Sequence, residues 1–195
     1  MSPATPTWVA LVHHPVLDRD GAVVTTSVTN LDVHDLARSA RTYGAAGLVV
    51  VTPIEAQRRI VERIVSYWNE PDHVRRIPRR REALRLVHVA PDLDGAVGIA
   101  ARAEGSAPVL VGTSARAGAD RVGFAAMRAR LGAPGAHPHL LVLGTGWGLA
   151  DEALARMDAV LEPVEGAGGY NHMSVRSAAA VILDRLLGSG PVTGP

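Results

Sequence analysis

The segment LVLGTGWGL, residues 141–149, ends an apolar run in three glycines at alternate positions. Such a run is typical of a strand in a parallel sheet, which is covered on both faces. Glycine has no side chain, so the backbone after the strand can come close to a ligand. Because ligands of open α/β sheets bind at the carboxyl ends of the strands, the segment predicts an α/β fold with a ligand site near Gly144.

A second glycine-containing segment follows, EGAGGYNHMSVRSAAA, residues 165–180. The helix that begins there needs only one N-cap residue, which Asn171 or Ser174 can supply. The additional polar side chains of Tyr170, His172 and Arg176 exceed that need. A helix N-terminus has free N–H groups for a polar or charged ligand, so the cluster strengthens the prediction of a ligand site at this end of the chain.

Apolar runs alternate with amphipathic segments along the rest of the chain. This alternation predicts one domain over residues 1–188, with a parallel sheet flanked by helices, and we expect residues 189–195 to be a disordered tail. Asp32 is the expected N-cap and Gly44 the expected C-cap of the first helix. Strands are predicted at residues 8–16, 47–52, 84–89, 109–112, 140–143 and 159–161. Helices are predicted at residues 33–43, 54–69, 93–103, 151–157 and 174–187.

The composition excludes several kinds of site. The 195-residue chain has no cysteine, which excludes disulfides, thiolate metal sites and cysteine nucleophiles. Its histidines lack the spacing of a zinc site, so we expect no metal. No apolar run reaches the roughly 20 residues that span a bilayer, and the N-terminal residues do not read as a signal peptide. We therefore expect a cytoplasmic protein with no membrane partner.

All 20 basic residues are arginines, although the net charge is only +1. They are concentrated in HVRRIPRRREALR, residues 73–85, where an arginine cluster is a candidate surface for phosphates. The alternative is a solvated loop that is basic because the whole chain favours arginine. The candidate phosphate-binding residues are Arg75, Arg76, Arg79, Arg80 and Arg81.

Three segments carry a family resemblance. LVLGTGWGL and LEPVEGAGGYNHMSVRSAAAVILDRLLG, residues 161–188, resemble motifs two and three of the SPOUT superfamily of RNA methyltransferases. The residues of these two motifs are most similar to those of a small single-domain branch that is sometimes found fused behind a tRNA guanine-N1 methyltransferase. TNLDVHDLARSARTYGAAGLVVV, residues 29–51, resembles motif one of the ribose methyltransferase members, in which an arginine stands six residues before a glycine, as Arg38 stands before Gly44.

The resemblance implies a C-terminal deep trefoil knot that binds S-adenosyl-L-methionine, largely through backbone groups. It also implies a homodimer that acts on RNA, either tRNA or rRNA, and the candidate phosphate-binding arginines would then bind RNA. The implied cofactor-binding residues are Thr113, Leu143, Gly144, Gly146, Trp147, Leu161, Pro163, Tyr170, His172 and Ser174.

The main prediction is 2'-O-methylation of ribose in tRNA or rRNA. Arg38 would orient the reacting group, and His172 or a substrate phosphate would take the proton, since an arginine stays protonated. Asn171 occupies the region of motif three in which many ribose methyltransferases have a catalytic asparagine. The alternative enzyme is a guanine N1-type base methyltransferase with Asp35 as the base. Hypotheses of other classes are a nicotinamide-dependent oxidoreductase that uses residues 144–148 with Glu162, and a knotted RNA-binding protein without catalysis.

Overall fold

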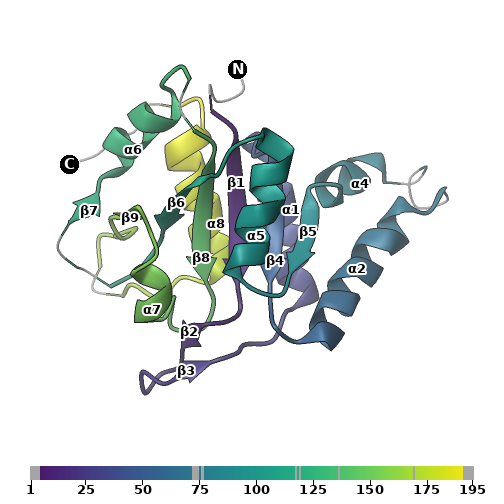
Figure 1. Cartoon of the computed structure of the whole chain (residues 1–195), viewed down its shortest axis with the longest axis horizontal. Coiled ribbons are helices and arrows are strands. Elements are labelled where there is room, and N and C mark those ends of the chain that lie inside the picture. Colours follow the sequence, from purple (N-terminus) through teal and green to yellow (C-terminus); the bar gives the residue numbers. More distant parts are fainter. Residues whose placement is uncertain are drawn as a thin grey trace.

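The computed structural model describes residues 5–71, 75, 77–116, 118, 120–135, 137–168 and 170–190. Over these residues the chain forms a parallel sheet with the strand order β5–β4–β1–β8–β6–β9–β7, and a separate small hairpin, β2–β3 (Figure 1). The sheet strands are β1 (Thr7–Val12), β4 (Gly47–Val51), β5 (Val87–Ala90), β6 (Val109–Gly112), β7 (Arg121–Val122), β8 (His139–Gly144) and β9 (Ala159–Leu161). The hairpin strands are β2 (Val16–Leu17) and β3 (Val23–Val24).

Helices cover both faces of the sheet. Successive side chains of a strand point to opposite faces, so Val9 and Leu11 of β1 pack in one core while Trp8 and Ala10 pack in the other. The first core is covered by α1 (Asn30–Thr42), α2 (Glu55–Asn69), α4 (Pro78–Leu84), α6 (Phe124–Leu131) and α8 (Val175–Leu187). The second is covered by α5 (Leu93–Glu104), which lies in front of the sheet in Figure 1, and by α7 (Asp151–Leu154).

The strands that the sequence predicts at residues 109–112 and 159–161 are confirmed. The strand predicted at 47–52 is one residue too long, and the strand predicted at 140–143 is one residue too short at each end. The first strand is shorter than predicted. β1 ends at Val12, and the chain turns into the β2–β3 hairpin, since Pro15 has no N–H group to continue a ladder. The predicted strand at 84–89 is also misplaced, because Leu84 ends α4 and β5 begins at Val87.

The expected N-cap of α1 is wrong by one turn. Thr29 is the N-cap, and its hydroxyl accepts a hydrogen bond from the N–H of Asp32. Asp32 occupies the third helical position and accepts from the backbone of Thr29, which completes a capping box. Gly44, with a φ of +73°, follows the C-cap Tyr43 rather than being the cap itself.

Candidate functional site

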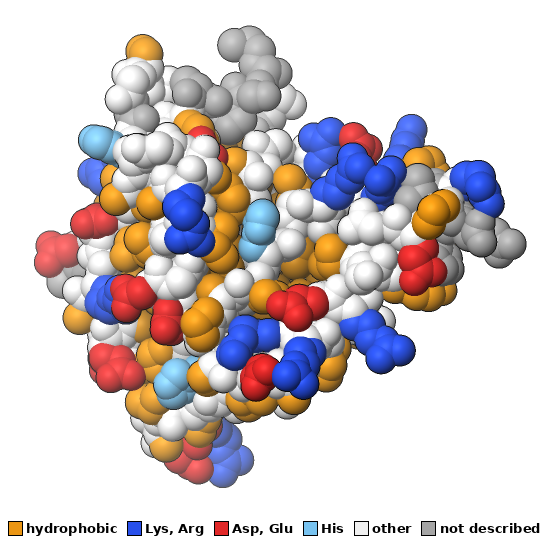
Figure 2. Space-filling view, turned by 45° about the vertical axis from the view of Figure 1, so that its right-hand side comes forward, with side chains coloured by type: hydrophobic (Ala, Val, Ile, Leu, Met, Phe, Trp, Pro, Cys, Tyr) orange, Lys and Arg blue, Asp and Glu red, His pale blue; other side chains and the backbone are white. Residues whose placement is uncertain are grey.

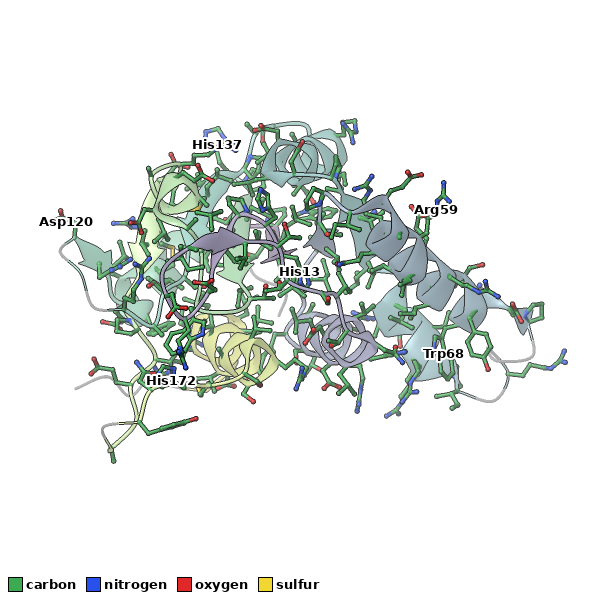
Figure 3. The ribbon with its side chains drawn as sticks, turned by 90° about the horizontal axis from the view of Figure 1, so that it is seen from below. His13, Arg59, Trp68, Asp120, His137 and His172 are labelled. Carbon is green, nitrogen blue, oxygen red and sulfur yellow. The ribbon has the colours of Figure 1, made fainter. Side chains whose placement is uncertain are left out.

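A cavity of about 980 Å³ lies at the carboxyl ends of β6, β8 and β9. Figure 3 looks onto this end of the molecule from below, with His172 beside α8. The walls of the cavity come from segments that are far apart in sequence. They are the β2–β3 hairpin with Thr26 and Ser27, residues 113–116 after β6, residues 143–148 at the end of β8 and after it, and residues 171–175 before and at the start of α8. Ala178 and Ile182 of α8 also line the cavity.

The glycines after β8 are required by the fold of their own loop. Gly146 has a φ of +60°, and a Cβ there would lie 2.8 Å from the carbonyl oxygen of Leu17. A Cβ on Gly144 would lie 2.5 Å from the backbone nitrogen of Leu149. The loop is also bonded to β2, since Leu17 accepts from the N–H of Trp147 and donates to the carbonyl of Gly148, each at 2.9 Å. Gly146 therefore lets the loop pack closely against the hairpin, and Gly144 lets the loop turn back on itself.

A buried hydrogen-bond chain joins the hairpin side of the cavity to β8. The Thr145 hydroxyl donates to the carbonyl of Val12 at 3.1 Å, so it accepts from the hydroxyl of Thr26. The Thr26 hydroxyl in turn accepts from Nδ1 of His13 at 3.0 Å. This order places the proton of His13 on Nδ1. Burial lowers the pKa of His13 to about 4, against a weaker opposing effect of Asp32, so the imidazole is neutral at pH 7.

The loop before α8 meets the glycine loop through aromatic rings. The rings of Trp147 and His172 are 5.2 Å apart, and those of His172 and Tyr170 are 5.5 Å apart. The Asn171 amide donates to the carbonyl of Ala115 at 3.2 Å, which fixes this loop to the residues after β6. Ser174 caps α8 by accepting from the N–H of Ser177, as the sequence allowed.

The structure brings together most of the expected cofactor residues. The cavity is lined by Thr113, Leu143, Gly144, Gly146, Trp147, His172 and Ser174. It is not lined by Leu161, Pro163 or Tyr170. Leu161 is buried in the core, and Tyr170 is 79% exposed outside the cavity.

Of the four expected catalytic residues, two line the cavity and two lie outside it. Asn171 and His172 line the cavity. Arg38 lies on α1, exposed to solvent, and does not line it. Asp35 also lies outside the cavity wall, with its carboxylate 3.6 Å from Nε of Arg176. Within one chain, therefore, Arg38 and Asp35 do not share the cavity with His172.

Asp32 is the carboxylate that does line the cavity. Its Oδ1 accepts from Nη1 of Arg176 at 2.7 Å, and its Oδ2 accepts from the hydroxyl of Thr29 at 2.6 Å. This buried group ties α1 to the first turn of α8. The T-x-x-D spacing at Thr29 could have identified the capping box, but no local signal pairs Asp32 with Arg176.

Glu162 does not act as a free ribose-binding acid. Its Oε1 accepts from the N–H of Phe124 at 2.9 Å, so its side chain caps the start of α6. Glu162 lines the cavity, but one oxygen of the acidic residue in the nicotinamide hypothesis is engaged within the chain.

The expected phosphate-binding arginines are carried mainly by α4. Figure 2 shows basic side chains gathered at the α2–α4 end of the molecule. Arg80 lies over the ring of Trp68 at 4.7 Å, and Arg81 donates to the side chain of Asn69. Arg75 and Arg79 are exposed, whereas Arg76 lies outside the described residues.

Arg38 shares this basic surface. His34 lies one helical turn before it on α1 and contacts the ring of Trp68 edge-on at 5.8 Å. Burial lowers the pKa of His34 most, and the charges of Arg80 and Arg38 lower it further, against the opposing effect of Asp35. Both arginines therefore act on the same imidazole. The pair Arg41–Glu82, at 2.7 Å, holds α4 against α1.

Within the described ranges, no group of three or more His, Cys, Asp or Glu side chains is placed to hold a metal ion. No helix in the same part of the chain is long and apolar enough to cross a membrane.

A family model described as SAM-dependent RNA methyltransferase matches residues 6–188. A tRNA (guanine-N(1)-)-methyltransferase of Nitratidesulfovibrio vulgaris is 46% identical over 181 residues, which are 93% of this chain and 42% of that protein. An uncharacterized protein of Aquifex aeolicus is 39% identical over 179 residues, 92% of this chain and 87% of that one. The chain thus spans less than half of the first relative and most of the second.

Solved structures share the fold. A probable methyltransferase from Bordetella pertussis has a TM-score of 0.61 at 16% identity, and the match covers 94% of this chain and 93% of that one. The SpoU methyltransferase AviRb from Streptomyces viridochromogenes, in complex with AdoMet, has a TM-score of 0.55 at 20% identity over 96% of this chain and 58% of that one. At these identities the likeness shows the α/β fold alone.

Proposed function

We propose that this chain, which belongs to the family of SAM-dependent RNA methyltransferases and is of the SPOUT type, methylates a guanine of tRNA at N1. The observation that carries the proposal is the match of 93% of the chain to a tRNA (guanine-N(1)-)-methyltransferase at 46% identity. That relative is more than twice as long, so its activity is proposed here and not transferred as a fact. The relatives favour the base reaction over the 2'-O-ribose reaction that motif one predicts.

The family's cofactor is S-adenosylmethionine, and the cavity suits it. Its volume lies near the top of the roughly 300–1,000 Å³ range of small-molecule sites. Leu143, Ala178 and Ile182 offer it an apolar floor, while the loops at Gly144 and Thr113 offer backbone polar groups. A mainly apolar pocket with a few polar groups is the usual environment of a nucleoside.

The reaction needs the methyl donor and the target nitrogen in line, and it needs an acceptor for the N1 proton. S-adenosylmethionine supplies the methyl group on a positively charged sulfur. His172 is the better-placed acceptor, because it lines the cavity and a neutral imidazole has a free lone pair. Asp35 stands outside the cavity and beside Arg176, and both oxygens of Asp32 are already engaged.

The basic surface of α4 and α1 is the proposed contact for the RNA backbone. Its described residues are Arg38, Arg75, Arg79, Arg80 and Arg81. Arg76, which the sequence also predicts to bind phosphate, lies outside the described residues. Arg38 and Arg80 both lie near His34, so an RNA strand that contacts α4 would also reach Arg38. In this proposal Arg38 holds a phosphate near the target nucleotide and does not contact the cofactor.

The C-terminal knot and the homodimer are also parts of the proposal. The strand order supports the knot: β8 and β9 flank β6, and the chain then returns to α8, which packs beside α1. The apolar stripe of α8, however, is buried in the chain's own core, so the dimer rests on the SPOUT resemblance. A tRNA substrate would place the reaction in the cytoplasm.

Nucleoside analysis tests this function. The protein is incubated with unmodified tRNA transcripts and isotopically labelled S-adenosylmethionine, and the digested RNA is separated by mass spectrometry. We expect labelled 1-methylguanosine, and loss of that product when His172 is changed to Ala. Labelled 2'-O-methylnucleosides in place of 1-methylguanosine would show that the protein methylates ribose, and Arg38 would then be the first residue to substitute.

A further inference from the structure

Three aromatic side chains form a continuous row at the edge of the cavity. Trp147 comes from the loop after β8, and His172 and Tyr170 come from the loop before α8. Neighbouring rings meet edge to face, with interplanar angles of 70° and 63°. Trp147 and His172 line the cavity, whereas Tyr170 does not. The row therefore leads from the cavity wall out to the surface.

This row is not part of the protein's packing. Trp147 is 51% exposed and Tyr170 is 79% exposed, and neither belongs to the two hydrophobic cores. Large aromatic side chains that stay in water beside a cavity are typical of a binding surface. The loop that carries Tyr170 and His172 is nevertheless held in place, because the amide of Asn171, which lies between them, donates a hydrogen bond to the carbonyl of Ala115.

We propose that the row Trp147–His172–Tyr170 is a stacking platform for an unpaired nucleobase of the RNA substrate. This inference rests on the proposed function in one respect, that the substrate is RNA. Single-stranded RNA is recognised largely by stacking its splayed bases on aromatic side chains. Because neighbouring rings meet edge to face, they are not coplanar, and a base would stack on one ring of the row. Tyr170, which is 79% exposed, offers the most open ring face.

The chemistry of the site favours a nucleobase over other occupants. Charged side chains of the cavity wall are already engaged within the chain: Asp32 with Arg176, Glu162 with the N–H of Phe124, and Arg116 with Asp151. The platform itself offers aromatic surface beside the cavity that would hold the methyl donor. A base stacked on Tyr170 would lie beside that cavity, so the platform would hold the RNA strand near the site of the methyl donor.

A direct binding titration tests the platform without relying on catalysis. The affinity for tRNA is measured by fluorescence anisotropy for the wild type, Tyr170→Ala and Tyr170→Phe. The control is Ile60→Ala, which removes a similarly exposed apolar side chain from α2. Tyr170→Ala should raise the Kd for tRNA by about tenfold, the effect of losing one stacked base. Tyr170→Phe and Ile60→Ala should bind like the wild type.

Two further measurements in the same samples complete the test. The affinity for S-adenosylhomocysteine should be unchanged in Tyr170→Ala, because Tyr170 lies outside the cavity, and the mass by light scattering should also be unchanged. An unaltered Kd for tRNA in Tyr170→Ala would overturn the platform. So would a Phe variant as weak as the Ala variant, or a changed mass, which would mean that a second copy covers the row. If Tyr170→Ala weakens tRNA binding but the wild type forms no 1-methylguanosine, the stacking platform is supported and the proposed function is rejected.

Discussion

Among single residues, His13 links the core of the sheet to the cavity. Its ring is fully buried, and its Nδ1 donates to Thr26, whose hydroxyl donates to Thr145. Both threonines line the cavity. The contact between Thr26 and Thr145 joins residues that are 119 positions apart, so no local pattern could predict it. The sequence identified the glycine loop itself, because glycines after an apolar run are a local signal.

The burial of His13 predicts a pH dependence of stability. Its pKa is about 4 in the folded protein and about 6.5 in the unfolded chain. Between these values the unfolded chain binds a proton that the folded protein does not, so the free energy of unfolding falls as the pH falls. The full contribution is present above about pH 6.5, and about 2 kcal/mol is lost by about pH 5.

The variant His13→Asn isolates this effect, since an asparagine amide can still donate to Thr26 but does not titrate. Urea unfolding at about pH 7.5 and about pH 5 should show a smaller loss of stability in the variant than in the wild type. The other histidines with lowered pKa values, His34, His88 and His139, are common to both proteins. An identical pH dependence in the two would show that His13 is not neutral and buried as described.

Among the elements, the wholly apolar strands were predictable, whereas the short strands β2, β3 and β7 and the basic helix α4 were not. β4 and β8 are almost wholly apolar runs, so their sequences predict buried strands. α4 has three consecutive arginines after Pro78 and lacks an apolar stripe. It is held in place by burial of Ala83 and Leu84 and by the pair Arg41–Glu82. Such tertiary contacts override local preference, which is why the strand predicted at residues 84–89 begins three residues before β5.

The position of α4 predicts a salt-dependent RNA contact. Changing Arg79, Arg80 and Arg81 together to Gln should weaken tRNA binding and reduce the slope of log K against log salt by about 2, since each phosphate contact contributes roughly 0.7–0.9. Filter binding over a range of salt concentrations measures this slope. A control triple variant, Arg102, Arg130 and Arg156 to Gln, removes the same charge elsewhere. Equal slopes in the two variants would mean that net charge, and not α4, binds the RNA.

For the whole molecule, the cavity exists only because distant parts of the chain meet. The β2–β3 hairpin belongs to the N-terminal half, whereas the loops after β6 and β8 and the start of α8 belong to the C-terminal half. The ion pair between Asp32 and Arg176 holds the two halves together at the cavity wall. Sequence motifs marked the two C-terminal glycine segments, but the hairpin wall carries no motif and follows from the tertiary fold alone.

Calorimetric titration with S-adenosylhomocysteine measures directly whether this cavity binds the methyl donor. Ala178 of α8 lines the cavity, whereas Ala180 of the same helix does not. We expect the wild type to bind with one site per chain. Ala178→Leu should bind at least about tenfold more weakly because the added side chain occupies the cavity, and Ala180→Leu should bind with wild-type affinity. No binding to the wild type, or equal affinity in Ala178→Leu, would show that this cavity is not the site of the methyl donor.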